Sequence, residues 1–264
     1  MNRQLVWFRD DLRAIDNPAL YYASQESTST IAVYIATPKQ WQQHDDAPSK
    51  IDFWRRNLKC LQATLSELNI SLHFFQVETY QQIPDLIASI CQHWKIKKLH
   101  FNQQYAFNEQ LRDQHVTDVC HKIGVQAHSY VDQLLLPPKS VRTKSGGAFK
   151  VFTPFAKQAR QQMQDPLVML PLPTAQHTIE ITHFPEKLEL DQISWPSVTK
   201  AIQLMWPAGE QSAEKSLISF CESTINGYQQ NRDIPSIPGT SGLSPYLTSG
   251  VISVKQCWLA TKVY

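Results

Sequence analysis

The N-terminal half of the sequence alternates between short apolar segments and longer stretches with helical periodicity. The five short segments are rich in aromatic and β-branched residues, as buried strands are, and they lie at residues 5–8, 31–35, 72–75, 99–101 and 126–130. Between them apolar residues recur every three or four positions, most clearly at Ile51, Trp54, Leu58, Leu61, Leu65 and Leu68. This order predicts an α/β fold: a doubly wound, parallel five-stranded sheet over residues 1–134 with helices on both faces.

Polar residues mark two helix starts in this half of the chain. Asp16 or Asn17, before Pro18, is expected to cap the first helix, and Ser49 with Asp52 is typical of a capping pair. The first strand is not followed by a Gly-x-Gly-x-x-Gly pattern, so we do not expect a nicotinamide-dinucleotide site.

After residue 134 the composition changes, because prolines and glycines become frequent. They predict a long connecting segment over residues 135–208, without long regular elements. Helical spacing returns with Leu217, Phe220, Cys221 and Ile225, which predicts that a helical domain begins at residue 209. Residues 209–264 are expected to form only the beginning of that all-α domain.

Composition limits the class of protein. The 264 residues are 42% hydrophobic and 18% charged, with a formal net charge of +2, which is too small to indicate nucleic-acid binding by itself. The five cysteines and nine histidines show no metal-ligand or redox-motif spacing, so we expect free thiols and no metal. Without a signal peptide or a bilayer-spanning apolar run, the protein is expected to be cytoplasmic.

A loop with two glycines and three hydroxyl side chains, Gly239-Thr240-Ser241-Gly242-Leu243-Ser244, is the first candidate binding site. Ser244 is the expected N-cap of a helix that has Pro245 at its first position. Backbone N–H groups at a helix start, together with hydroxyl donors, suit a phosphate or a pyrophosphate. An ordinary capped turn is the alternative.

Four segments, taken in order, carry a resemblance to a known family. They are LVWFRDDLR at residues 5–13, KVFTPF at 150–155, YQQNRD at 228–233 and GTSGLSPYL at 239–247. In this order they resemble the DNA photolyase/cryptochrome family, and within it the bacterial cyclobutane-dimer photolyases that carry a folate antenna. The resemblance runs from Leu5 to about Trp258 and covers nearly the whole chain.

The resemblance implies a flavin site and a DNA contact. Residues that match FAD-contacting positions of the family, at the diphosphate and ribityl parts, are Tyr228, Thr240, Ser241, Gly242, Leu243 and Ser244. Gly242 stands where some relatives have an arginine, and Tyr228, taken without the resemblance, is better interpreted as a core aromatic residue. Arg232 matches an arginine that contacts the DNA backbone, a role suited to a guanidinium, although a surface ion pair with Asp233 is the alternative.

His44, Asn108 and Glu109 match the family's site for 5,10-methenyltetrahydrofolate. His44 lies beyond the second predicted strand and Asn108-Glu109 beyond the fourth, so a parallel sheet brings them to one edge. Amide and carboxylate groups supply the donors and acceptors that a pterin ring requires. Alternatively, Asn108 caps the next helix and Glu109 favours its first turn. Relatives with a deazaflavin antenna, or with none, differ here.

Charged residues elsewhere are assigned structural roles. Arg9, Asp10 and Arg13 are interpreted as ion pairs across the domain junction, and no residue is expected to act as a catalytic acid or base. The segment from Lys139 to Gln164 has six Lys or Arg and no acidic residue. It is either a DNA-facing patch or a solvated connecting loop, and the flanking Pro and Gly favour the loop.

The resemblance implies the activity of a deoxyribodipyrimidine photo-lyase: excited, reduced FAD splits pyrimidine dimers in damaged DNA, with energy from the folate antenna. We expect a monomer. Because most of the family's flavin cavity lies beyond the matching residues, this chain by itself is expected to show little or no repair. The alternatives are a cryptochrome-type photoreceptor and a non-catalytic folate- or nucleotide-binding α/β protein.

Overall fold

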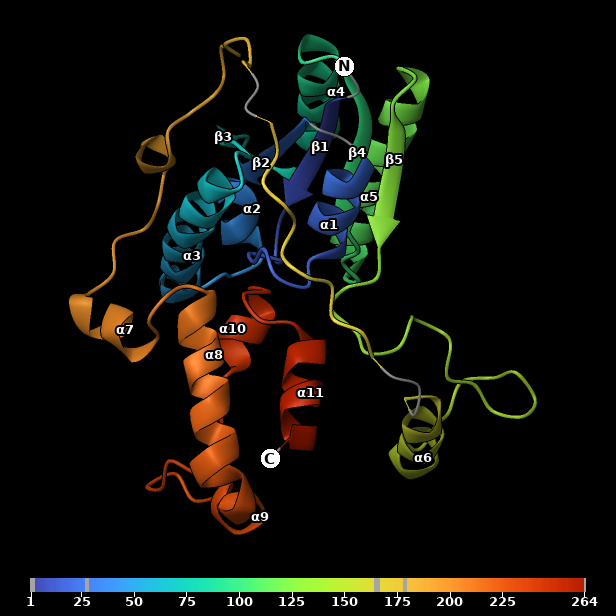
Figure 1. Ribbon diagram of the computed structural model, residues 1–264, viewed down its shortest axis with the longest axis vertical. Coiled ribbons are helices and arrows are strands. Elements are labelled where there is room, and N and C mark those ends of the chain that lie inside the picture. The colour runs from blue at the N-terminus through green and yellow to red at the C-terminus, as the bar shows by residue number, and fades with distance from the viewer. Residues whose placement is uncertain (1–2, 27–28, 164–166, 178–179, 264) are drawn as a thin grey trace.

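Five parallel strands form one sheet in the computed structural model, which describes residues 3–26, 29–163, 167–177 and 180–263 (Figure 1). The sheet order is β3-β2-β1-β4-β5, so the prediction of a parallel five-stranded sheet is confirmed. Its strands are β1 (Arg3–Phe8), β2 (Thr30–Ala36), β3 (Leu72–Gln76), β4 (Ile96–Asn102) and β5 (Gln126–Tyr130).

Helices cover both faces of the sheet, because successive side chains of each strand point to opposite sides. Val6 and Phe8 pack into a core with α1 and α3, whereas Leu5 and Trp7 pack into a second core with α4 and α5. The helices of this α/β part are α1 (Pro18–Glu26), α2 (Pro38–Gln43), α3 (Pro48–Glu67), α4 (Ile83–His93) and α5 (Phe107–Lys122).

The two predicted caps have different outcomes. The Oδ1 of Asn17 accepts a hydrogen bond from the Leu20 N–H at 3.1 Å, as a cap of α1 should. Ser49 is not a cap: Ala47 is the N-cap of α3, and Pro48 occupies the first turn ahead of Ser49. A proline favours that first position, so the helix starts two residues closer to the N-terminus than predicted.

The connecting segment follows the edge of the sheet and contains one longer helix. The Leu188 N–H donates to the Phe74 carbonyl at 2.8 Å, beside β3. Contrary to the expectation of no long regular element, α6 (Phe152–Gln162) has eleven residues and projects from the body (Figure 1). Pro154 lies in its first turn, where an N–H has no intrahelical partner to lose. The short α7 (Lys200–Met205) follows.

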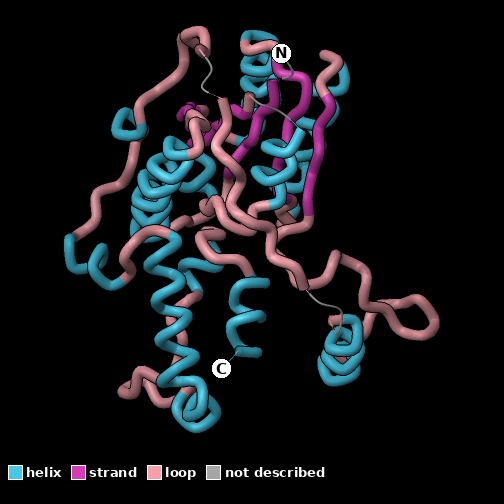
Figure 2. The backbone as a smooth tube through the Cα atoms, in the orientation of Figure 1, coloured by secondary structure: helices cyan, strands magenta, loops and turns pink. Residues whose placement is uncertain are grey.

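Residues 210–263 contain helices that lie beyond the carboxyl ends of the strands (Figure 2). They are α8 (Glu210–Ser219), continued by π and 3₁₀ turns to Gly227, then α9 (Tyr228–Asn231), α10 (Ser244–Thr248) and α11 (Val254–Val263). Leu217, Tyr246 and Ile252 belong to the same buried cluster as Leu12 and Phe53, so these helices share a core with the α/β part. No helix within the described ranges is both long and apolar enough to cross a bilayer.

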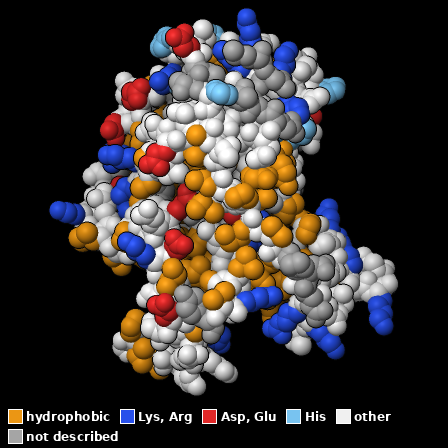
Figure 3. All heavy atoms as spheres, in the orientation of Figure 1, with side chains coloured by type: hydrophobic (Ala, Val, Ile, Leu, Met, Phe, Trp, Pro, Cys, Tyr) orange, Lys and Arg blue, Asp and Glu red, His pale blue; other side chains and the backbone are white. Residues whose placement is uncertain are grey.

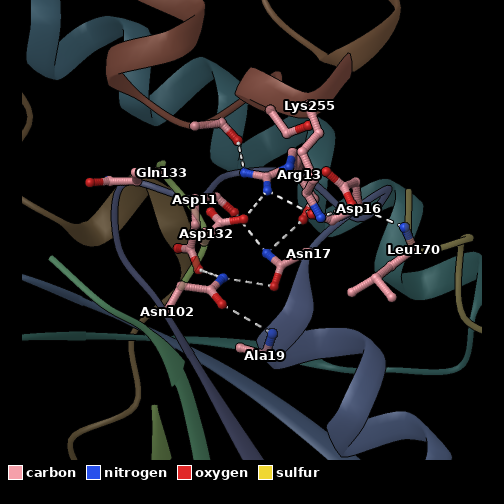
Figure 4. A network of polar contacts seen from close by, with 12 residues as sticks. Asp11, Arg13, Asp16, Asn17, Ala19, Asn102, Asp132, Gln133, Leu170 and Lys255 are labelled. Carbon is pink, nitrogen blue, oxygen red and sulfur yellow. Dashed lines mark hydrogen bonds and ion pairs between the residues drawn. The ribbon is translucent and has the colours of Figure 1, made fainter. Parts of the chain in front are cut away.

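A buried polar network joins these helices to the loop after β1 (Figure 4). Arg13 forms an ion pair with Asp132, and its Nη1 donates to the Gly250 carbonyl at 3.0 Å. Lys255 of α11 lies 2.7 Å from the buried carboxylate of Asp16. Arg13 thus crosses the junction by a hydrogen bond to a backbone carbonyl, whereas its ion pair with Asp132 lies inside the α/β part, so the predicted ion pairing of Arg13 across the junction is wrong. The same prediction is wrong for Arg9, which pairs with Asp113 inside the α/β part at 3.2 Å.

Candidate functional site

His44, Asn108 and Glu109 lie together at the carboxyl ends of the strands. His44 ends α2, which follows β2, and the other two residues stand in the first turn of α5, which follows β4. The Asn108 Nδ2 is 3.3 Å from the His44 Nε2, and the His44 Nδ1 is 3.9 Å from the Glu109 Oε1. The structure therefore brings the three predicted residues to one point, as the parallel order requires.

Neighbouring side chains hold this trio in place. The Gln40 side chain hydrogen-bonds His44 at 3.0 Å, and the Tyr80 hydroxyl donates to the Glu109 Oε1 at 3.2 Å. The N-cap of α5 is Ala106, with no side-chain capping bond, so the alternative that Asn108 is a helix cap is wrong. The Asn108 side chain contacts His44 instead of capping the helix.

His44 and Glu109 line a polar pocket, and a chain of polar contacts that the sequence did not reveal also lines it. The Arg112 guanidinium lies over the rings of Trp7 and Tyr80, at 4.9 and 4.6 Å from their centroids. It donates to the Gln104 Oε1 at 2.6 Å, and the Gln104 amide donates to the Asp10 Oδ2 at 2.6 Å. Burial raises the pKa of Asp10 to about 6. Arg112 stands one helical turn beyond Asn108, which is the one signal that could have identified it.

Three buried donors that line this pocket have no hydrogen-bond partner among the described residues. They are the indole N–H groups of Trp7 and Trp54 and the Nε of Arg9. A buried donor without a partner is costly, so native proteins rarely keep several together unless water or a ligand satisfies them. With the carboxylate of Glu109, the pocket offers the mixture of donors and acceptors that a pterin requires, and Asn108 is exposed beside His44, outside the lining of the pocket.

The candidate flavin residues lie on two segments that touch. A Cβ on Gly239 would come within 2.6 Å of the Asn231 carbonyl, so the glycine lets the loop approach the end of α9, on which Tyr228 stands. Thr240 and Ser244 are exposed, and the Ser241 Oγ accepts from the Leu243 N–H at 3.4 Å. Tyr228 is half-exposed and packs edge-on against Phe220, so it is not a fully buried core residue.

The helix after this loop starts one residue earlier than predicted. Leu243, not Ser244, is the N-cap of α10, because the Leu247 N–H already bonds the Leu243 carbonyl at 2.9 Å. Pro245 is consequently the second helical residue. Since α10 has only five residues, its dipole is small, and the donors that suit a diphosphate are the loop hydroxyls and N–H groups. The Ser244 hydroxyl makes no capping bond and remains available.

Gly242 has a conformational reason to be glycine. Its φ is +62°, in the left-handed region, and a Cβ there would meet no atom within 4 Å. An arginine at this position would therefore have room but would bear backbone strain. The loop presents its backbone without a charged side chain here.

The candidate DNA contact is exposed beside the flavin residues. The Arg232 side chain is 52% exposed, 3.3 Å from Asp233, and its guanidinium carbon lies 6.0 Å from the centroid of the Tyr228 ring. The ion-pair alternative is thus present, but an exposed pair of this kind contributes little and leaves the guanidinium accessible. The basic side chains around α6 gather on the lobe that projects from the body (Figure 3).

A parallel α/β sheet with a polar pocket at its carboxyl edge, joined to helices that carry a hydroxyl-rich loop, gives this chain two candidate ligand sites. The DNA photolyase family pattern matches residues 4–176, and the chain belongs to this family. Within the described residues, no group of three His, Cys, Asp or Glu could hold a metal ion.

Individual relatives agree with this assignment. The deoxyribodipyrimidine photo-lyase of Vibrio cholerae is 36% identical over 259 residues, which cover 96% of this chain and 54% of that protein. A class III photolyase of Agrobacterium tumefaciens superimposes with a TM-score of 0.83 at 27% identity, over 99% of this chain and 53% of its own. The chain thus spans about half the length of these relatives. An uncharacterized 31.6 kDa protein of Synechococcus sp. is 28% identical and is covered over 88% of its length.

Proposed function

We propose that this chain takes part in light-dependent repair of cyclobutane pyrimidine dimers in DNA, with a 5,10-methenyltetrahydrofolate antenna and FAD as cofactors. The observation that carries the proposal is the convergence of His44, Asn108 and Glu109 at the carboxyl edge of the sheet, in a chain of the DNA photolyase family. Bound folate would absorb near-UV light and supply excitation energy to the flavin.

The residues of the pocket have distinct parts in holding the pterin. The Glu109 carboxylate would accept the paired N–H groups at the edge of the ring, with its orientation fixed by Tyr80. Asn108 would complete the polar edge with one donor and one acceptor, and His44 would close the outer side. The unpartnered indole N–H of Trp7 lies deeper and would donate to an acceptor of the ligand.

Tyr228 and the loop from Thr240 to Ser244 would hold FAD. Their hydroxyl and backbone N–H donors suit the diphosphate, and reduced FAD would supply the electron that opens the dimer. Arg232, exposed beside Tyr228, would contact a DNA phosphate without reading sequence. Damaged DNA is therefore the proposed macromolecular partner.

The 264-residue chain by itself is expected to show little or no repair. Thr240, Gly242 and Ser244 are exposed and Tyr228 is half-exposed, so the described residues do not enclose a flavin ring. Light-driven electron transfer to a flipped-out dimer requires a cofactor shielded from water and fixed beside the base.

A loading experiment tests the proposal. The purified chain would be incubated with FAD and with 5,10-methenyltetrahydrofolate separately, desalted, and examined by absorption spectroscopy, and then irradiated with an oligonucleotide that contains a thymine dimer. We expect retained folate, weak or no retention of FAD and no repair. If the chain retains neither folate nor FAD, the proposed function is contradicted. Efficient repair would contradict the expected inactivity of the chain.

A further inference from the structure

A second cavity adjoins the pocket of His44 and Glu109. It has a volume of about 300 Å³ and lies between the N-terminal turns of α3, the short helix α7 and α10. Lys50 and Trp54 line both the cavity and the pocket, so the two share a wall. We call it the α3–α7–α10 cavity.

The walls of the cavity suit an aromatic ring. Phe53 and Trp54 come from α3, Trp206 lies just beyond α7, and Ile202 and Pro245 add aliphatic surface. The packing that fixes these walls is well defined, since Phe53 is held edge-on by Tyr246 at 5.3 Å. Most of the surface that a ligand would bury here is apolar, as is usual in small-molecule sites at the junction of two parts of a chain.

The polar groups of the cavity favour an anion. Its two charged lining residues are Lys50 and Arg56. Lys50 is oriented by Asp46 at 2.6 Å, and Arg56 by Asp52 at 2.7 Å and by the Trp206 carbonyl at 2.8 Å. These contacts use one of three donors of the ammonium and two of five of the guanidinium, so further donors remain for a carboxylate.

A buried donor in the shared wall independently points to a ligand. Trp54 is 6% exposed, and its indole N–H has no partner among the described residues. The ring is held on one side by Trp41 and covered by Lys50 at 4.8 Å, so it cannot turn easily to find another acceptor. An acceptor on a molecule in the pocket or the cavity would remove this cost.

We propose that the α3–α7–α10 cavity binds an aromatic ring that bears a carboxylate, and that its occupant is the aminobenzoyl-glutamate arm of the folate. The identity of the occupant rests on the proposed function. The arm is attached to the pterin ring, and the cavity adjoins the pocket at Lys50 and Trp54, which line both. Its aromatic ring meets the indole and phenyl walls, and its carboxylates meet Lys50 and Arg56.

The placement has a structural consequence. Because α3 belongs to the α/β part, α7 to the connecting segment and α10 to the last helices, a ligand in the cavity contacts all three parts. Binding of the arm therefore stabilises the packing of α10 against α3, in addition to holding the antenna.

The test uses p-aminobenzoyl-L-glutamate, which lacks the pterin, and the full 264-residue chain in isothermal titration calorimetry. We expect the wild-type chain to bind this fragment. Lys50→Met and Ile202→Glu should each weaken it at least tenfold, the first by removing a cation and the second by adding an anion beside the carboxylate. Lys59→Met, on the exposed face of the same helix, is the matched control and should leave the affinity within twofold. Far-UV circular dichroism confirms that each variant is folded.

The pterin side of the folate separates this inference from the proposed function. Glu109→Gln should weaken 5,10-methenyltetrahydrofolate but leave the fragment unchanged, since Glu109 does not line the cavity. Binding of the fragment without binding of the whole folate would contradict the proposed folate antenna and would support a site for aromatic carboxylates. Binding of the folate that is insensitive to Lys50→Met and Ile202→Glu, with no binding of the fragment, would overturn the inference and leave the antenna intact.

Discussion

Gly250 lies very close to the backbone of the loop after β1, and its replacement by alanine tests how firmly the last helices are joined to the α/β part. Gly250 follows α10 with a φ of +64°, and a Cβ there would lie 2.1 Å from the Asp10 carbonyl oxygen and 2.5 Å from the Asp11 Cα. Since real Cβ contacts are essentially never below 3.0 Å, one backbone must withdraw by about 1 Å. Gly124, at the end of α5, has a similar φ of +74° but no atom within 4 Å of its Cβ position.

The two glycines therefore predict different losses of stability. A left-handed alanine costs about 1–2 kcal/mol at either position. At Gly250 the withdrawal also weakens the Leu12 N–H bond to the Ser249 carbonyl, at 3.1 Å, and the Arg13 bond to the Gly250 carbonyl, at 3.0 Å. These hydrogen bonds contribute about 1 and 1.5–3 kcal/mol. Gly250→Ala should thus lose about 3–5 kcal/mol, and Gly124→Ala about 1–2 kcal/mol.

Urea unfolding followed by tryptophan fluorescence measures the difference. With a denaturant slope of about 3 kcal/mol per molar urea, the midpoint should fall by about 1–1.7 M for Gly250→Ala and by about 0.5 M for Gly124→Ala. Limited proteolysis of Gly250→Ala should also cut between the sheet and the last helices sooner than in the wild type. Equal losses in the two variants would refute the close approach and the firm junction inferred from it.

Three further predictions concern charged groups. The carboxylate of Glu210 accepts hydrogen bonds from the N–H groups of residues 14 and 15 at 2.8 and 3.1 Å. Glu210→Ala should therefore lower the free energy of unfolding in urea by about 2 kcal/mol, whereas Glu214→Ala, at an exposed position, should lower it by about 0.5 kcal/mol or less. Equal losses in the two variants would contradict this prediction. Burial raises the pKa of Asp10 to about 6, above its ordinary 3.8, so the ionised carboxylate lowers stability as the pH rises through about 6. Asp10→Asn should therefore stabilise the chain by about 1–2 kcal/mol in thermal melts above about pH 7 and have little effect near about pH 4, and a pH-independent effect would contradict the assignment. Fluorescence anisotropy measures how the affinity for DNA falls with salt. Arg232→Ala should reduce the slope of log affinity against log salt concentration by about one unit, whereas Arg55→Ala should not. An unchanged slope would contradict a contact between Arg232 and a DNA phosphate.

The sheet could be predicted from the sequence because buried parallel strands are short, apolar and separated by helical periods. All five predicted segments lie in strands, with boundaries within a few residues. The helix starts were less predictable, since they depend on local backbone geometry. At Ser49 and at Ser244 a nearby proline marked the right turn, but the helix began one or two residues before the expected position.

The resemblance to the family identified His44, Asn108 and Glu109, and their meeting at one edge could be predicted because each follows a strand and parallel strands end at one edge. The inner part could not be predicted. The spacing from Asn108 places Arg112 on the same face of α5, but its contacts with Trp7 and Tyr80 arise only from the packing of α5 against the sheet. The unpartnered indole N–H groups are likewise visible only in three dimensions.

The central claim is that Glu109 and its neighbours hold the pterin of a folate antenna. The most direct measurement is a fluorescence titration of the wild-type chain with 5,10-methenyltetrahydrofolate, beside Glu109→Gln and beside Asp118→Asn, an exposed carboxylate on the same helix. We predict saturable binding by the wild type and by Asp118→Asn, and an affinity at least tenfold weaker for Glu109→Gln. Equal affinities in all three, or no saturable binding by the wild type, would contradict the claim.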